Sequence, residues 1–165
     1  LKKYPNIKFI YNEKYNEANN ISSAYLVRDK FSNSYVLESD LYLYNQDLIR
    51  KYEYHSNFLG FKADRTDDWC LETKNGIITK EKVGGLDCYQ MCGISYYDKE
   101  TGKQMEKDIK EVFMSPGGKE RYWEQVMLDV RKNNYKIYLR ECKKEDIIEI
   151  DTFNELKAID KTYDV

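Results

Sequence analysis

Tyr35-Val36-Leu37-Glu38-Ser39-Asp40, followed by Leu41-Tyr42-Leu43, is the stretch of sequence that decides the fold. Its apolar, β-prone residues predict a buried strand that ends abruptly on a carboxylate. In open α/β sheets, ligands bind beyond the carboxyl ends of the strands, so an acid at that position faces the crevice. Asp40 is therefore the first candidate for a metal ligand.

A second short apolar run, Ile147-Ile148, leads into Glu149-Ile150-Asp151 far down the chain. Carboxylates that end separate strands can converge on one hard cation, and Mg²⁺ typically takes one or two protein carboxylates, leaving its other positions for water and phosphates. Such a site suits phosphoryl or nucleotidyl transfer. The alternative is purely structural: Asp40 begins a turn, and Asp151 caps a helix that has Glu155 in its first turn.

The rest of the chain alternates between strand and helix patterns, as an α/β protein does. Lys74-Asn75-Gly76 predicts a hairpin turn, because Asn-Gly readily supplies positive φ. Gly93, inside the longest strand pattern, indicates a close approach of backbone or ligand. Besides the strand ending at Asp40, the predicted strands cover residues 7–11, 57–62, 69–73, 77–83, 88–97 and 136–141. The predicted helices cover residues 20–30, 103–112 and 120–132, a segment after Asn45 and a segment from Thr152.

Composition predicts one folded domain. With 165 residues, 41% of them hydrophobic and 15% aromatic, the chain can bury a substantial core, which excludes disorder as its main state. A formal charge of −2 lacks the basic footprint of a nucleic-acid-binding protein. The sequence has no apolar run of membrane-spanning length and no secretory leader, so we expect no membrane partner and a cytoplasmic location.

The four cysteines raise the question of a metal or disulfide site. Cys88 and Cys92 lie an even number of residues apart in a predicted strand, on one face. The spacing of the cysteines is not that of a zinc knuckle, and His55 is the sole histidine. We therefore predict buried free thiols at Cys70, Cys88, Cys92 and Cys142.

Several segments, taken in order, resemble one family. They are Asn12-Glu13-Lys14-Tyr15, Asn19-Asn20-Ile21-Ser22-Ser23, the strand ending at Asp40, Asp68-Trp69, Cys92-Gly93-Ile94-Ser95-Tyr96-Tyr97, Arg121-Tyr122-Trp123-Glu124 and Glu149-Ile150-Asp151. This series resembles the bacterial phosphocholine cytidylyltransferases, which are nucleoside-diphosphate-sugar pyrophosphorylase-like nucleotidyltransferases. The resemblance covers nearly the whole chain. It implies the α/β C-terminal part of a Rossmann-like nucleotide-diphospho-sugar transferase fold, with a mixed sheet flanked by helices.

The resemblance also implies a reaction: transfer of CMP from CTP to phosphocholine, giving CDP-choline and pyrophosphate. Asp40 and Asp151 would hold Mg²⁺, with Glu149 assisting directly or through water. The reaction needs no protein nucleophile or general base, because a phosphate monoester is already an anion near neutral pH. The expected partners are therefore CTP and a small phosphorylated alcohol. The sequence leaves the oligomeric state open.

Four further residues are candidates for substrate contacts. Trp69 and Tyr122 match aromatic positions that, in the resembling enzymes, form a cage around the quaternary ammonium of phosphocholine. The alternative is that Trp69 and Trp123 fill the core and Tyr122 covers it. Asn20 and Ser23 match a loop that lies against the nucleotide base, although Asn19 or Asn20 could equally be a plain helix N-cap. An acid near Trp69 could add charge complementarity, and Asp67, Asp68 and Glu72 all remain open for that role.

The chain departs from the family in one respect. These enzymes open with a strand and a glycine-rich loop that carries an arginine and, a little later, a lysine, whereas this chain begins at Leu1-Lys2-Lys3-Tyr4-Pro5 without an initiating Met. We expect residues 1–165 to be a single, N-terminally truncated nucleotidyltransferase domain. Two alternatives stay open: a nucleotidyltransferase that acts on a sugar 1-phosphate or on 2-aminoethylphosphonate, and a non-catalytic binding module derived from this fold.

Overall fold

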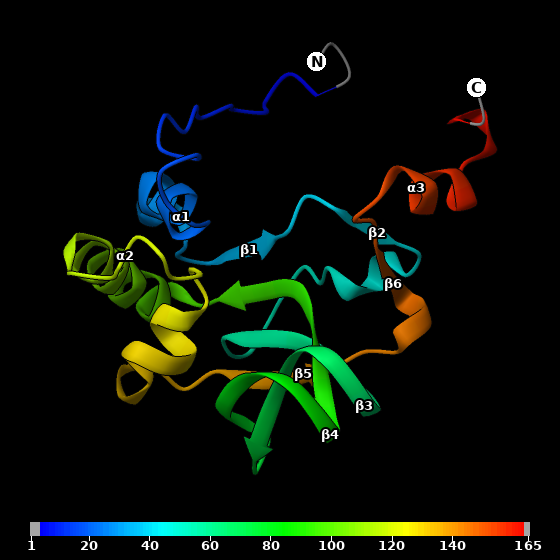
Figure 1. Cartoon of the computed structure of the whole chain (residues 1–165). Coiled ribbons are helices and arrows are strands. Elements are labelled where there is room, and N and C mark those ends of the chain that lie inside the picture. The colour runs from blue at the N-terminus through cyan, green and yellow to red at the C-terminus, as the bar shows by residue number, and fades with distance from the viewer. Residues whose placement is uncertain (1–3, 164–165) are drawn as a thin grey trace.

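A mixed four-stranded sheet forms the centre of the protein (Figure 1). The computed structural model describes residues 4–163. The strand order is β1 (Ser34–Leu37), β4 (Ile77–Tyr97), β3 (Asn57–Lys74) and β5 (Tyr138–Glu141), with β3 and β5 parallel and the other neighbours antiparallel. A separate two-stranded sheet joins β2 (Leu41–Leu43) to β6 (Ile147–Glu149).

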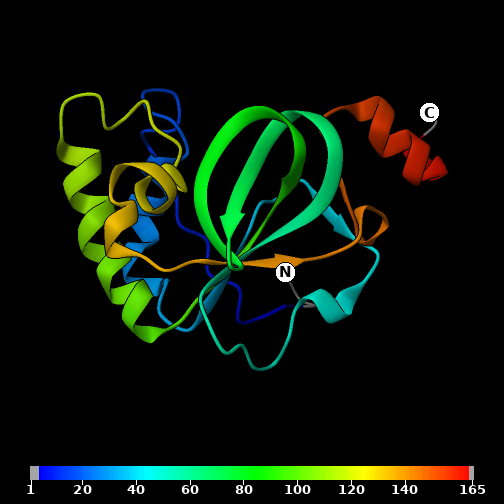
Figure 2. The ribbon, with the colours of Figure 1, turned by 90° about the horizontal axis from the view of Figure 1, so that it is seen from below.

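The long hairpin of β3 and β4 curls over the centre of the molecule (Figure 2). Its turn is the predicted one, because Asn75 and Gly76 take φ of 53° and 76°. The ribbon coils so far that Cys70 pairs both with Lys82 and with Gln90. The predicted strands over 57–62 and 69–73 are thus parts of one continuous strand, and so are those over 77–83 and 88–97.

The helices α1 (Ile21–Val27) and α2 (Lys99–Met114) lie together at one end of the sheet (Figure 1). Asp98 caps α2 by accepting a hydrogen bond from the Thr101 N–H at 2.9 Å. Met105 and Ile109 on α2 are fully buried against Ile21 of α1 and Trp123 in the main core. A third helix, α3 (Phe153–Ile159), lies at the opposite end of the molecule.

Several predictions of secondary structure were wrong. Residues 7–11 form no strand, since among the described residues none pairs with them. The segment after Asn45 makes only one 3₁₀ turn, because the Asn45 side chain accepts from the Asp47 N–H and Ile49 returns to extended backbone. The predicted helix over 120–132 is limited to a π-helical turn at Val126–Val130 and a 3₁₀ turn at Lys132–Asn134.

The mixed sheet with flanking helices confirms the predicted α/β class. All four cysteines are buried and free, as predicted; the sulfur atoms of Cys92 and Cys142 lie 3.5 Å apart. Within residues 4–163, no helix has the length and apolar character needed to cross a membrane.

Candidate active site

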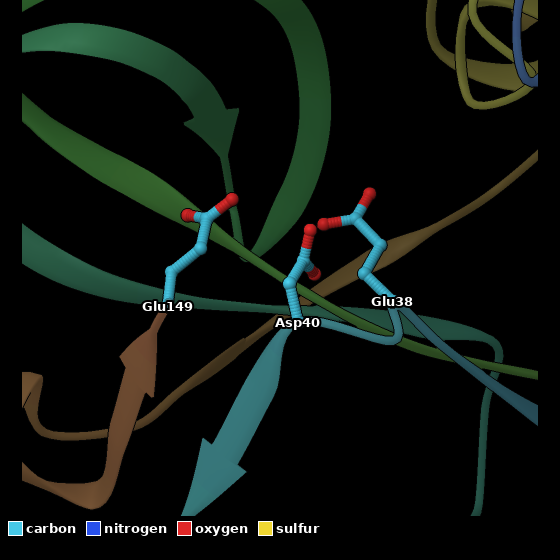
Figure 3. A group of neighbouring side chains, drawn as sticks. All are labelled: Glu38, Asp40 and Glu149. Atoms are coloured by element: carbon cyan, nitrogen blue, oxygen red, sulfur yellow. The ribbon is translucent and has the colours of Figure 1, made fainter. Parts of the chain in front are cut away.

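Three carboxylates converge beyond the end of β1: those of Glu38, Asp40 and Glu149 (Figure 3). An oxygen of each lies within 4.8 Å of an oxygen of the other two. β1 ends at Leu37 and is only partly buried, so the predicted buried strand ending on Asp40 is wrong: Glu38 and Asp40 lie in the turn between β1 and β2. Glu149 ends β6. The structure thus brings together two of the three predicted metal ligands and adds Glu38.

A close approach of two strands fixes the position of Glu38. Its N–H donates to the Gly93 carbonyl at 3.0 Å, and Gly93 has a φ of +60°. A β-carbon added to Gly93 would lie 2.3 Å from Oε2 of Glu38, so the carboxylate occupies the space that any larger residue would fill. The close approach predicted at Gly93 is therefore confirmed, and it involves a side chain of this cluster.

The small β2–β6 sheet fixes Asp40 against Glu149. Leu41 is the register partner of Glu149, and the Ile150 N–H donates to the Asp40 carbonyl at 2.9 Å. These bonds bring two segments that are far apart in the sequence to the same edge. The sequence predicted that Asp40 would meet Asp151, with Glu149 assisting. In the structure, direct backbone pairing brings Asp40 together with Glu149 instead.

The cluster is short of positive charge. Burial, followed by the charges of Asp151, Asp68, Glu38 and Asp40, raises the pKa of Glu149 to about 7. Burial and then the charges of Asp40 and Asp68 also raise the pKa of Glu38. Because like charges that share a site disfavour each other's ionisation, a hard divalent cation with oxygen ligands fits this position chemically.

Asp151 lies outside the three-carboxylate cluster, although its charge reaches Glu149. Its N–H donates to Oε2 of Glu155 at 2.9 Å, ahead of the first turn of α3. Thr152, not Asp151, is the N-cap of α3, in a capping box with Glu155. The structure therefore offers Glu38 where the sequence suggested Asp151. The available signal was the spacing of Glu38 and Asp40, two residues apart after the strand.

A cavity of about 620 Å³ adjoins the acidic cluster, and all four predicted substrate residues line it: Trp69, Tyr122, Asn20 and Ser23. The rings of Trp69 and Tyr122 meet edge to face, with centroids 5.4 Å apart and planes at 67°. Because the rings touch, they form a corner instead of two separated walls. A cation would lie against this corner, where the ring faces attract positive charge.

The cavity also distinguishes the acids and aromatics that the sequence left open. Asp68 lines the cavity and accepts from the Trp69 N–H, whereas Glu72 pairs with Lys82 and Asp67 with Arg65. Trp123 is only 6% exposed and packs on Phe31, Phe58 and Tyr97 in the core, whereas the Tyr122 ring is 39% exposed. The packing interpretation therefore holds for Trp123.

Asn20 and Ser23 already make contacts within the protein. Oδ1 of Asn20 accepts from the Trp123 N–H at 2.8 Å, and Nδ2 of Asn12 donates to the Ser23 hydroxyl at 3.0 Å. Asn20 stands at the N-cap of α1 without a side-chain capping bond. A role in nucleotide binding stays a prediction for both residues.

The fold and this site together correspond to the nucleotidyltransferases. No protein-family model matches the chain. The chain is, however, similar to a choline-phosphate cytidylyltransferase of Streptococcus pneumoniae, with 26% identity over 98% of this chain and 70% of the relative. It is also similar to a 2-aminoethylphosphonate cytidylyltransferase of Lancefieldella rimae, with 27% identity over 98% of this chain and 67% of the relative.

Solved structures confirm the fold. A CTP:phosphocholine cytidylyltransferase from Streptococcus pneumoniae matches with a TM-score of 0.84 and 24% identity, over 98% of this chain and 71% of that one. An inositol-1-phosphate CTP transferase from T. maritima matches with a TM-score of 0.59 and 13% identity, over 93% of this chain and 62% of that one. The resemblance recognised from the order of the segments is thus confirmed, as is the predicted nucleotidyltransferase fold.

Proposed function

We propose that the protein transfers CMP from CTP to phosphocholine, giving CDP-choline and pyrophosphate. One observation carries the proposal: the Glu38–Asp40–Glu149 cluster and the Trp69–Tyr122 corner line the same cavity. The first can hold a cation beside phosphates, and the second suits a quaternary ammonium. The curated relatives, two named for choline phosphate and one for 2-aminoethylphosphonate, support the same reaction class.

Mg²⁺ is the cofactor that we assign to this reaction. Glu38, Asp40 and Glu149 would hold it. Asp151 would contribute only through its charge, which acts on Glu149. When bound, Mg²⁺ supplies positive charge that offsets the repulsion between the two phosphate-bearing substrates. The protein's own contribution is positional. The acidic cluster defines where the phosphates meet, and the aromatic corner orients the acceptor from its other end.

In the proposed step, an oxygen of phosphocholine attacks the α-phosphorus of CTP. The new P–O bond forms as the bond to the bridging oxygen breaks, and pyrophosphate carries away the negative charge. Asn20 and Ser23 lie beside the cavity as the candidates for contacts to the cytosine base. In this proposal residues 1–165 are one nucleotidyltransferase domain that acts in the cytoplasm, as the sequence predicts.

The test is pyrophosphate release from CTP and Mg²⁺ by the full-length protein, with phosphocholine, 2-aminoethylphosphonate or a hexose 1-phosphate as acceptor. We expect a clear preference for phosphocholine. Asp40→Asn should nearly abolish turnover without unfolding the protein, whereas Asp87→Asn, at an exposed position away from the cavity, should change little. Full activity of the Asp40→Asn protein would refute the assignment of the site.

The leading alternative acceptor is 2-aminoethylphosphonate, because one curated relative carries that name. Its primary ammonium can donate hydrogen bonds to carboxylates and needs no full aromatic cage. A preference for it would replace the acceptor and keep the reaction type. A preference for the sugar phosphate would remove the role of the aromatic corner, and no release with any acceptor would favour a non-catalytic module.

A further inference from the structure

Glu124 is a buried acid that the proposed reaction does not use. It is 2% exposed, it follows Trp123 directly, and it lines the same cavity as Trp69 and Tyr122. Its Oε2 has no hydrogen-bond partner. Among the described residues, Glu124 forms no ion pair. Arg121, three residues before it in the sequence, pairs with Asp129 at 3.0 Å.

A buried carboxylate with one unpartnered oxygen is costly, because removal of a charge from water must be offset by pairing or hydrogen bonding. Burial raises the pKa of Glu124 to about 7, against a hydrogen bond from its own backbone N–H that lowers the pKa and with a smaller contribution from the charge of Glu38. The cavity therefore contains a carboxyl group that has no cationic partner among the described residues. A ligand that brought a cation to this place would supply it.

A quaternary ammonium is a cation that suits this carboxyl group in particular. It cannot donate a hydrogen bond, so its recognition relies on ring faces and on charge. The Trp69–Tyr122 corner supplies the ring faces, and Glu124, when ionised, supplies a negative charge to the same cavity. The other acids of the cavity are Asp68, which accepts hydrogen bonds from the Trp69 N–H and from Gln90, and the Glu38–Asp40–Glu149 cluster, which we assign to the metal and phosphate end of the substrates.

We propose that Glu124 is the residue that selects a cationic acceptor, by facing the ammonium group across from the Trp69–Tyr122 corner. This role rests on the proposed function, because it assumes an acceptor that carries an ammonium group. Glu124 would be the residue that distinguishes a charged acceptor from an uncharged one. The step is binding alone, so Glu124 affects the Michaelis constant of the acceptor and leaves the chemistry of CMP transfer unchanged.

The test compares phosphocholine with 3,3-dimethylbutyl phosphate, its neutral carbon isostere, in the full-length protein at pH 8, where Glu124 is mostly ionised. Both acceptors have nearly the same shape, so only the charge differs. Glu124→Gln keeps the size of the side chain and removes its charge. We expect the KM for phosphocholine to rise about 10-fold or more, with kcat, the KM for CTP and the KM for the neutral isostere nearly unchanged.

Glu81→Gln is the matched control. Glu81 is likewise buried, with both carboxylate oxygens unpartnered, but it does not line the cavity. Because the charges of Glu81 and Glu124 disfavour each other, removal of the Glu81 carboxylate favours the ionised form of Glu124, so we expect Glu81→Gln to retain the preference for phosphocholine over the isostere. Calorimetric titration of each protein with each acceptor, in the absence of CTP, reports binding independently of turnover.

Two outcomes would overturn the role of Glu124: an equal effect of Glu124→Gln on both acceptors, or no effect on either. A third outcome has a different meaning. If the wild-type protein neither binds nor turns over phosphocholine but accepts a neutral sugar phosphate, the proposed acceptor itself fails, and the charge-reading role fails with it. Loss of charge preference in Glu124→Gln with CMP transfer retained would support both.

Discussion

Gly93→Ala should weaken metal binding although residue 93 carries no ligand. The new methyl group would lie 2.3 Å from Oε2 and 2.9 Å from Cδ of Glu38, and 3.2 Å from the Leu41 side chain. Glu38 must therefore leave the position at which it meets Asp40 and Glu149. Changes of this kind, one shell away from a metal, typically reduce affinity by about 10- to 100-fold.

The substitution also strains the backbone, because Gly93 has a φ of +60° and alanine at such an angle costs about 1–2 kcal/mol. Gly117→Ala separates the two effects: its φ is +72°, and nothing lies within 4 Å of the added methyl. Both variants should lose similar stability in urea unfolding, whereas only Gly93→Ala should lose affinity in a Mn²⁺ or Mg²⁺ titration. Wild-type affinity in Gly93→Ala, or an equal loss in Gly117→Ala, would refute the role given to Glu38.

Two further predictions concern the aromatic corner and a buried acid. Trp69→Ala should raise the KM for phosphocholine about 30-fold and leave the KM for CTP unchanged, since a desolvated cation–π contact is worth roughly 2 kcal/mol. Steady-state kinetics, with each substrate varied in turn, measure both constants. Equal changes in the two KM values would indicate a general folding defect and contradict the prediction. Burial, then the charges of Glu124 and Asp129, raises the pKa of Glu81 to about 8 from 4.5, so the folded state favours the protonated form. The free energy of unfolding should therefore fall as the pH rises from about 5 to 8, by a few kcal/mol at about 1.4 kcal/mol per pKa unit. In urea unfolding at about pH 5 and about pH 8, Glu81→Gln should reduce the difference between the two free energies of unfolding. The same difference as in the wild type would contradict the assignment.

Local signals predicted those parts of the fold that depend on neighbouring residues. Asn75-Gly76 needs only its own backbone preferences to form the hairpin turn, and the helix predicted from Thr152 is present, although its N-cap is Thr152 and not Asp151. Residues 7–11 show the limit of such signals. Their pattern is that of a strand, but a strand also needs a partner, and the described part of the chain provides none.

The candidate site could be predicted only in part, for a similar reason. Asp40 and Glu149 each follow an apolar run, and this signal was sufficient to place them at one edge. Glu38 joins them because Gly93, on a different strand, leaves room for its carboxylate. A pattern within one segment does not contain that information. The same holds for Glu124, whose importance follows from the burial of an unpartnered carboxylate oxygen in the folded protein.

The pairing of β2 with β6 has a consequence for the protein during its synthesis. Glu38 and Asp40 leave the ribosome early, but Glu149 emerges only after the whole β3–β4 hairpin, α2 and β5. Until Glu149 has been made, the nascent chain contains two of the three carboxylates and no complete cluster. A chain released before Glu149 would therefore lack the complete candidate metal site, whose assembly waits until β6 has been made and can pair with β2.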